Sequence, residues 1–312
     1  MATTSANTGW TPADAPRLDG KVVIVTGATG GLGYETALAL ARHGATTILA
    51  GRNPDKGARA VARIQGQLPS AKLRFELLEL DSLGSVARFA AAWDGVLDVL
   101  INNAAVMGLP KRERTEDGFE RQIGVNYLAH FALTIRLLDA IRAAPGGGRV
   151  VNIASLAHRR GTLELDDFQS EQSYGPMRAY GRSKLAMLMF ALELQRRADK
   201  NRWNLRSMAA HPGWARTDII GNGIGSGGPS VRARVAEMAF NLVAQPAKEA
   251  ALPVLFAAMA PEAKGGAYYG PSDWGETRGA PGVSKIFSQA TDPVAAGRLW
   301  ALSEKLTGQV AS

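Results

Sequence analysis

The chain has 312 residues, of which 46% are hydrophobic and 21% charged, an ordinary balance for a globular protein with a sizeable core. It contains no cysteine, which excludes disulfides and thiolate metal sites, and its four histidines lack any paired ligand spacing, so no metal site is expected. The net charge of +8 comes mostly from arginines spread along the chain without an aromatic-basic platform. We therefore expect a positive, solvated surface that favours anionic ligands, and no nucleic-acid partner.

The N-terminal region contains no apolar run in its first twenty residues, which argues against a signal peptide or a membrane anchor. No later segment reaches the roughly 18 consecutive apolar residues of a membrane-spanning helix. We expect a cytoplasmic protein. Because no linker divides the chain, residues 1–18 are predicted to form an N-terminal arm and residues 19–312 a single domain.

Short apolar, β-branched runs alternate with longer helical patterns along the chain. The predicted strands cover residues 21–27, 46–51, 73–80, 96–104, 149–155, 204–213 and 265–270, and the predicted helices include 32–43, 117–143 and 178–198. Strands without polar alternation are buried on both faces, which is typical of parallel sheets. The pattern predicts an α/β fold with a Rossmann-like, doubly wound parallel sheet of about seven strands and helices on both faces.

The sequence TGATGGLG (26–33) follows the first predicted strand and opens the first helix. In that context glycines permit a tight turn and let backbone amides approach a pyrophosphate. Two spacings are present, because Gly27 and Gly33 can be combined with either Gly30 or Gly31. Both spacings hold dinucleotides, but they are used by different groups of enzymes, and the glycines alone do not decide between them.

The ends of the next three predicted strands carry further candidates for a dinucleotide site. Arg52 occupies the position where NAD-preferring sites place an acid, and a guanidinium there would pair with a 2′-phosphate, so we predict NADP(H) rather than NAD(H). Asp81 ends the third strand, where its carboxylate would accept from the adenine amino group or, equally, cap the following helix. The remaining predicted cofactor contacts in this half of the chain are Thr29, Leu32, Asn103 and Ala104.

The second half of the chain carries candidates for proton transfer. Tyr180 and Lys184 are four residues apart in AYGRSKLAMLMF and share one helix face. A neighbouring ammonium favours the phenolate, so we expect Lys184 to lower the pKa of Tyr180. Ser155, at the end of the fifth strand, supplies a hydroxyl able to hold a substrate oxygen. Each feature is weak alone, and only their combination points to acid–base chemistry.

The combined motifs resemble the short-chain dehydrogenase/reductase family. The matching sequences are TGATGGLG, the strand-ending NNAA (102–105), GVNYLAH around Asn126, VVNIAS with Ser155, AYGRSK (179–184) and HPGWART (211–217). They occur in the family's order over about residues 20–270. NNAA and HPGWART are typical of the shorter, single-domain members, which favours the register Gly27, Gly31 and Gly33.

The resemblance implies a role for each matching residue. Tyr180 would be the catalytic acid/base, and Ser155 would orient the carbonyl or alcohol. Lys184 would bind the nicotinamide ribose, and Asn126 would hold a water that links the lysine to a proton relay. The predicted contacts to the nicotinamide end of the cofactor are Pro212, Gly213 and Thr217.

Within the family, the insert between Ser155 and Tyr180 is similar to that of retinol-dehydrogenase-like members. This similarity implies NADP(H)-dependent hydride transfer to or from a small-molecule alcohol, aldehyde or ketone, with residues 218–245 closing over a hydrophobic substrate. Two alternatives remain, namely an epimerase or dehydratase of the longer branch and a non-catalytic NADP(H)-sensing protein. The resemblance also implies a homodimer or homotetramer paired through the helices around 117–143 and 178–198.

Overall fold

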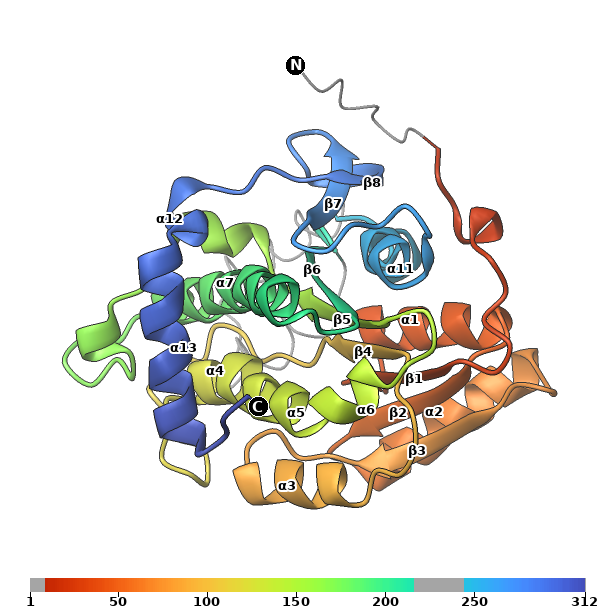
Figure 1. The fold of residues 1–312 in the computed structure, drawn as a ribbon, viewed down its shortest axis with the longest axis horizontal. Coiled ribbons are helices and arrows are strands. Elements are labelled where there is room, and N and C mark those ends of the chain that lie inside the picture. Colours follow the sequence, from red (N-terminus) through yellow and green to blue (C-terminus); the bar gives the residue numbers. More distant parts are fainter. Residues whose placement is uncertain (1–8, 216–243, 312) are drawn as a thin grey trace, which may run out of the picture.

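The computed structural model describes residues 9–215 and 244–311, and these form one eight-stranded sheet in the order β3-β2-β1-β4-β5-β6-β7-β8 (Figure 1). Neighbouring strands are parallel except that β8 runs antiparallel to β7. The strands are β1 (Val22–Thr26), β2 (Thr46–Gly51), β3 (Leu73–Leu77), β4 (Val99–Asn102), β5 (Gly148–Ile153), β6 (Leu205–Ala210), β7 (Tyr268–Asp273) and β8 (Arg278–Val283). The order reverses direction between β1 and β4, which is the topological switch point of a doubly wound sheet.

The seven predicted strands are present, and the structure adds β8. Its sequence, RGAPGV, contains glycine and proline and no apolar run, so nothing in it indicated a strand. β8 pairs only with β7, at the edge of the sheet, where such residues are tolerated. The C-terminal part of the chain therefore extends the same sheet.

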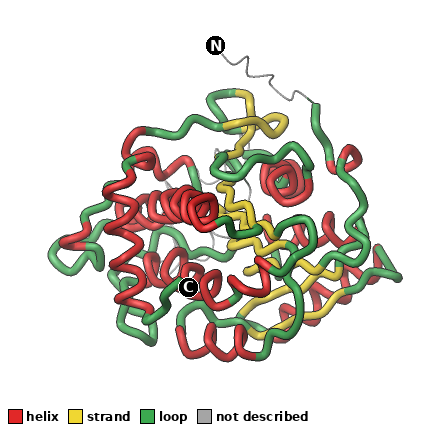
Figure 2. Tube along the Cα trace, in the orientation of Figure 1, coloured by secondary structure: helices red, strands yellow, loops and turns green. Residues whose placement is uncertain are grey.

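Helices cover both faces of the sheet (Figures 1 and 2). One face carries α1 (Gly31–Arg42), α2 (Pro54–Gln67), α10 (Ala247–Ala250) and α11 (Leu252–Met259), and the other carries α3 (Leu83–Ala91), α5 (Ala129–Arg136), α6 (Leu138–Arg142) and α7 (Pro176–Asn201). The shorter elements are the 3-10 turns Pro12–Asp14, Leu156–Arg160 and Leu165–Asp167, together with α4 (Arg121–Ile123) and α12 (Ser288–Thr291). A longer helix, α13 (Pro293–Thr307), lies near the C-terminus. The sheet thus separates two core layers, a first one beneath α1, α2, α10 and α11 and a second one beneath α3, α5, α6 and α7. The side chains of β1 alternate between them, because Val23 and Val25 lie in the first layer and Ile24 in the second.

The predicted helix 117–143 is not continuous. It is divided into α4, a π-helical turn (Gly124–Leu128), α5 and α6. Single π turns interrupt α-helices most often at functional sites. Here the π turn contains Asn126, so the interruption falls on a predicted site residue.

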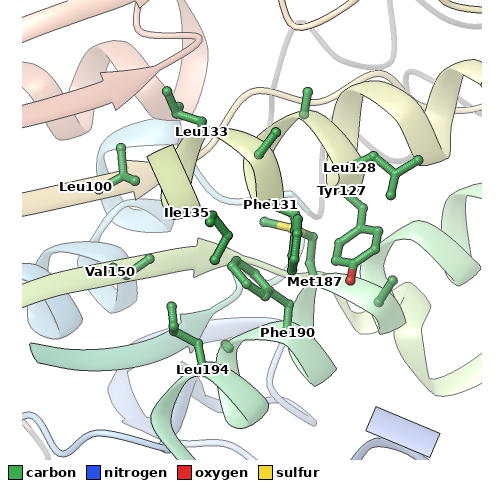
Figure 3. Close-up of a cluster of buried hydrophobic side chains, with 14 of the residues drawn as sticks. Leu100, Tyr127, Leu128, Phe131, Leu133, Ile135, Val150, Met187, Phe190 and Leu194 are labelled. Atoms are coloured by element: carbon green, nitrogen blue, oxygen red, sulfur yellow. The ribbon is translucent and has the colours of Figure 1, made fainter. Parts of the chain in front are cut away.

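The face of α5 and α7 is covered by α13 of the same chain. Phe131 of α5 and Phe190 of α7 meet in the second core layer (Figure 3), and the Trp300 ring packs on them with centroid distances of 5.1 and 5.8 Å. The Tyr127 hydroxyl is 2.7 Å from Ser303 Oγ, which fastens α13 to the π turn. A dimer formed through these two helices, as the resemblance implies, would have to accommodate α13.

The described part of the predicted N-terminal arm lies against the body of the protein. Trp10 is only 5% exposed, and its ring packs edge-on against Phe256 of α11 at 5.2 Å. Nowhere in the described ranges is a helix both long and apolar enough to cross a bilayer.

Residues 215 and 245 form a parallel β-bridge with one another. The Gln245 backbone donates to the Trp214 carbonyl at 2.8 Å, and its side-chain amide donates to the Pro212 carbonyl at 2.6 Å. The predicted substrate-closing segment, 218–245, lies outside the described residues except for its last two positions.

Candidate functional site

A cleft of about 640 Å³ opens at the carboxyl ends of β1 to β4, on the switch point of the sheet. Ligands of doubly wound folds bind at this position. The cleft is lined by every cofactor contact predicted in the first half of the chain: Gly27, Thr29, Gly31, Leu32, Gly33, Arg52, Asp81, Asn103 and Ala104.

The backbone of the glycine turn distinguishes the two registers. Gly27 and Gly31 have φ of +67° and +51°, in the left-handed region that glycine favours, whereas Gly30 has an extended φ of −166° that any residue adopts. A Cβ on Gly33 would lie 2.4 Å from the Gly27 carbonyl oxygen and 2.6 Å from Asn103 Nδ2. The geometry therefore supports the register Gly27, Gly31 and Gly33, in which Gly33 allows α1 to pack closely against the glycine turn and the end of β4.

Asn103 and Ala104 hold the end of β4 against the glycine turn. Their backbone N–H groups both donate to Thr26 Oγ1, at 2.9 and 3.0 Å, and Asn103 Nδ2 donates to the Thr26 carbonyl at 2.7 Å. His130 of α5 lies on the other side of Thr26, with Nε2 2.9 Å from Oγ1 and Nδ1 3.0 Å from the Asn126 carbonyl. Burial lowers the pKa of His130 to about 4, so the ring is neutral at pH 7.

The neutral state of His130 fixes the direction of its hydrogen bonds. The Asn126 carbonyl only accepts, so Nδ1 carries the proton and Nε2 accepts from the Thr26 hydroxyl. The Thr26 oxygen is then free to accept both backbone N–H groups. A continuous hydrogen-bonded path thus joins the wall of the cleft to the π turn.

The outer end of the cleft carries two cations. Arg52 follows β2, and Lys56 lies in the first turn of α2, which Asn53 caps by accepting from the Lys56 backbone at 2.9 Å. Both side chains are exposed, and neither has an ion-pair partner within the described residues. Lys56 was not predicted. Its position in the first turn of the helix that begins at Asn53-Pro54 would have indicated it as a second cation beside Arg52.

Asp81 lines the cleft but does not cap α3. Ser82 is the cap, accepting from the Ser85 backbone at 3.4 Å, whereas Asp81 Oδ1 accepts from Arg121 Nε at 3.1 Å. Arg121 also pairs with Glu113 at 2.5 Å. The helix-cap alternative is therefore wrong, and the carboxylate is held at the mouth of the cleft.

Ser155 and Tyr180 are brought together beyond the end of β5. Tyr180 is 7% exposed, and the Ser155 side chain lies near enough to its hydroxyl to act on its pKa. Ser155 also begins the 3-10 turn Leu156–Arg160, where its Oγ accepts from the Ala157 backbone at 3.2 Å. A hydroxyl pair at this point is able to hold one oxygen atom between two groups that donate and accept protons.

Lys184 lies one helical turn from Tyr180, but the electrostatics differ from the expectation. Burial raises the pKa of Tyr180 to about 12, with the Ser155 hydrogen bond acting in the opposite direction. Burial also lowers the pKa of Lys184 to about 7. The predicted lowering of the tyrosine pKa by the lysine is absent in the protein alone, because Nζ lies 5.8 Å from the phenol ring and is itself only partly charged at neutral pH.

Asn126 joins the two ends of the site. Its amide bonds both backbone groups of Val106, which lines the cleft, at 2.8 and 2.9 Å. The same Nδ2 atom donates to Ser183 Oγ at 2.9 Å, and Ser183 donates to the Tyr180 carbonyl at 2.8 Å. Ser183 was missed from the sequence, although it stands inside AYGRSK.

Pro212 and Gly213 follow β6, and Gly213 has a φ of +65°. Thr217 lies outside the described residues. The lining of the cleft, as far as the described residues define it, does not extend to Ser155, Tyr180, Lys184, Pro212 or Gly213. The structure therefore connects the two halves of the predicted site through Asn126 and the strand ends.

Comparison with known proteins places these features in a family. A family model described as short chain dehydrogenase matches residues 21–223. Polyprenol dehydrogenase from Mus musculus is 38% identical, with 95% of this chain and 87% of the relative covered. Retinol dehydrogenase 13 from Homo sapiens is 39% identical, with 93% and 86% covered.

Solved structures agree with the fold. The crystal structure of an uncharacterized protein from Mycobacterium paratuberculosis is 37% identical, with a TM-score of 0.81 over 98% of this chain and all of the other (100%). A short chain dehydrogenase from Shigella flexneri complexed with NADP is 23% identical, with a TM-score of 0.59 over 82% of this chain and 98% of the other, a likeness in fold alone.

Proposed function

Because the chain belongs to the short chain dehydrogenase family, as a retinol-dehydrogenase-like oxidoreductase, we propose that it transfers a hydride between NADP(H) and a hydrophobic alcohol or carbonyl compound, with Tyr180 as the acid/base. The observation that carries this proposal is the pairing of the buried Tyr180 with the half-buried Ser155 beside the end of β5.

The hydroxyls of Ser155 and Tyr180 would have separate roles in the reaction. Ser155 donates a hydrogen bond to the substrate oxygen and orients it, while Tyr180 gives its phenolic proton to that oxygen during reduction and takes one back during oxidation. A bound nicotinamide would supply or accept the hydride at the substrate carbon. With a pKa of about 7, Lys184 is suited to return a proton toward Tyr180 at neutral pH.

The residues that line the cleft favour the binding of a dinucleotide that carries a 2′-phosphate. Gly27 and Gly33 let the start of α1 pack closely against the ends of β1 and β4, and a pyrophosphate bound at this helix start would meet N–H groups that favour an anion. Arg52 and Lys56 together offer two positive charges at the outer end, where the adenosine ribose would lie. Asp81, held by Arg121, would accept a hydrogen bond from the adenine amino group.

The class of substrate rests on the named relatives. Polyprenol and retinol are long hydrophobic alcohols, and both names occur among relatives that cover most of this chain. We infer a substrate of the same kind, a primary alcohol or aldehyde attached to a hydrophobic chain.

Turnover by the purified protein tests the proposal, followed through the absorbance of the reduced nicotinamide over alcohols and aldehydes of increasing chain length. We expect higher kcat/KM with NADP than with NAD, and higher kcat/KM with longer chains. Equal or better use of NAD would refute the role of Arg52 and Lys56.

The Tyr180→Phe variant tests the acid/base. Removing the hydroxyl should lower kcat by about 10²- to 10⁴-fold with little change in dinucleotide affinity. Tyr269→Phe is the matched control, since that buried tyrosine bonds the Lys264 backbone away from the site and its loss should leave kcat unchanged. Full turnover by Tyr180→Phe would refute the mechanism.

A further inference from the structure

We propose that Glu276 is a positioning residue that holds the loop after β6, with Pro212 and Gly213, against the turn that begins at Ser155. The inference rests on the proposed function in so far as that loop faces the nicotinamide and that turn carries the catalytic serine. Its structural part stands on contacts between three segments that are far apart in the sequence.

Glu276 lies in the turn between β7 and β8, and its carboxylate contacts both segments. Oε2 is 2.6 Å from Arg159 Nη2, within the turn that Ser155 caps, and 3.4 Å from Nε2 of His211, which immediately precedes Pro212. Oε1 accepts from the Lys285 backbone at 3.1 Å. One carboxylate thus joins the serine turn, the loop after β6 and the far side of its own hairpin.

His211 is fully buried, and its hydrogen bonds assign its tautomer. The Gly213 backbone N–H donates to Nδ1 at 3.2 Å, so Nδ1 is unprotonated and the ring proton is on Nε2. That proton faces Ser284 Oγ at 2.9 Å and the Glu276 carboxylate. Each ring nitrogen therefore has a defined partner, and the ring orientation is fixed from the hairpin side.

The carboxylate is kept charged. Burial acts to raise the pKa of Glu276, but the hydrogen bonds with His211 and the Lys285 backbone and the charge of Arg159 outweigh it and hold the pKa at about 2. Within the described residues no other carboxylate pairs with either Arg159 or His211. The Glu276 carboxylate is therefore charged at neutral pH.

The backbone of Glu276 is held in an unfavourable conformation by its surroundings. Glu276 has a φ of +69°, which is unfavourable for a residue with a side chain and persists only where the surroundings determine it. A Cβ on Gly270 would lie 1.9 Å from His211 Nε2, so the neighbouring strand leaves space for the ring only because it carries a glycine.

A second contact ties the same loop to the same hairpin. The Trp214 backbone N–H donates to the Thr277 carbonyl at 2.9 Å, and a Cβ on Gly213 would lie 2.3 Å from that oxygen. The loop is therefore bonded to the hairpin on both sides of Pro212. Reacting groups need placement to within fractions of an ångström, so a device that fixes the distance between Ser155 and this loop affects kcat more than binding.

Amide hydrogen exchange of the protein alone tests the positioning without any nucleotide. In Glu276→Ala we expect exchange to accelerate by about 10-fold or more at the amides of residues 211, 213–215 and 155–160 and to stay unchanged in β1 and α1. Glu276→Gln keeps the length and the bond from Lys285, and should give a smaller acceleration at the same amides. Unchanged exchange at these amides, or an acceleration spread evenly over the sheet, would overturn the inference.

Steady-state kinetics test the consequence of the Glu276 contacts for catalysis. We expect Glu276→Ala to lower kcat by about 10- to 100-fold while the dissociation constant for adenosine 2′,5′-bisphosphate, which probes only the outer end of the cleft, changes less than about 2-fold. Glu76→Gln, which removes an exposed ion pair with Arg74 on β3, is the matched control and should change neither value.

The two proposals fail in distinguishable ways. A wild-type protein that turns over no alcohol or carbonyl compound refutes the proposed function, while the exchange data still decide on Glu276. A wild-type protein that turns over, with an unchanged kcat in Glu276→Ala, refutes the positioning role alone.

Discussion

Lys184 Nζ donates a hydrogen bond to the carbonyl oxygen of Ile153 at 2.8 Å, two residues before Ser155. This contact anchors the side chain at the end of β5, and only 3% of Lys184 is exposed. Because burial lowers its pKa to about 7, the group gains or loses its proton near neutral pH. A proton-exchanging amine thus stands beside the proposed acid/base.

The buried amine should make folding stability depend on pH. Between pH 7 and the ordinary lysine pKa of 10.5, the unfolded chain binds a proton at Lys184 that the folded chain does not. The free energy of unfolding of the wild type should therefore rise, relative to Lys184→Met, by up to about 1.4 kcal/mol per pH unit above pH 7, and the difference should be flat below it. Urea unfolding of both proteins from about pH 6 to about pH 9 measures this, and parallel pH profiles would contradict it. Lys200→Met, at an exposed position of α7, is the control.

The two cations at the outer end of the cleft should determine cofactor preference. We expect Arg52→Ala and Lys56→Ala each to weaken NADP binding by about 10-fold, which is about 1.4 kcal/mol, and to leave NAD binding nearly unchanged. Arg59→Ala, on the exposed side of α2, should affect neither. Fluorescence titration with the reduced forms gives these constants, and equal losses for both cofactors would argue against a 2′-phosphate contact.

The glycine turn offers a test of close backbone approach. Gly33→Ala would press a methyl group against the Gly27 carbonyl and Asn103, so we expect dinucleotide binding to be lost and the free energy of unfolding to fall by about 1–3 kcal/mol. Gly66→Ala is the matched change, because its Cβ would meet nothing within 4 Å and should stabilise α2 by about 0.5–1 kcal/mol. Calorimetry and nucleotide titration of the two variants distinguish them, and normal binding by Gly33→Ala would contradict the register.

Helix α13 should contribute strongly to stability through Trp300, which is 1% exposed and packs on Phe131 and Phe190. Trp300→Ala should lower the free energy of unfolding by about 3–5 kcal/mol. Trp274→Ala, at a position 78% exposed, should cost less than about 1 kcal/mol. Denaturant unfolding followed by circular dichroism compares them, and similar losses would mean that α13 is loosely attached.

Much of the sheet was predictable because buried parallel strands consist of continuous apolar runs, as in KVVIVTG and RVVNIAS. The predicted strands were often too long at their carboxyl ends, for example 73–80 against Leu73–Leu77. Those extra residues turn away from the ladder to line the cleft. The division of the helix at Asn126 was not predictable, because the contacts that accompany it, from Asn126 to Val106 and Ser183, join separate segments that no local pattern connects.

The candidate site was likewise predictable from the sequence only in part. The glycine turn and the Tyr180–Lys184 spacing depend on neighbours in the sequence, so motifs reveal them. Glu276, Arg159 and His211 come from three separate segments, and a partly buried ion pair between distant segments has no characteristic sequence spacing. The pKa of Tyr180 likewise depends on burial, which a motif does not report.

The bridge between Ala215 and Gln245 brings together two residues that are 30 positions apart in the sequence, the first of them just after Pro212 and Gly213. The Gln245 side chain also donates to the Pro212 carbonyl. A substitution at position 245 should therefore be felt at the proposed nicotinamide end of the site, although it lies far from every motif that identifies that site.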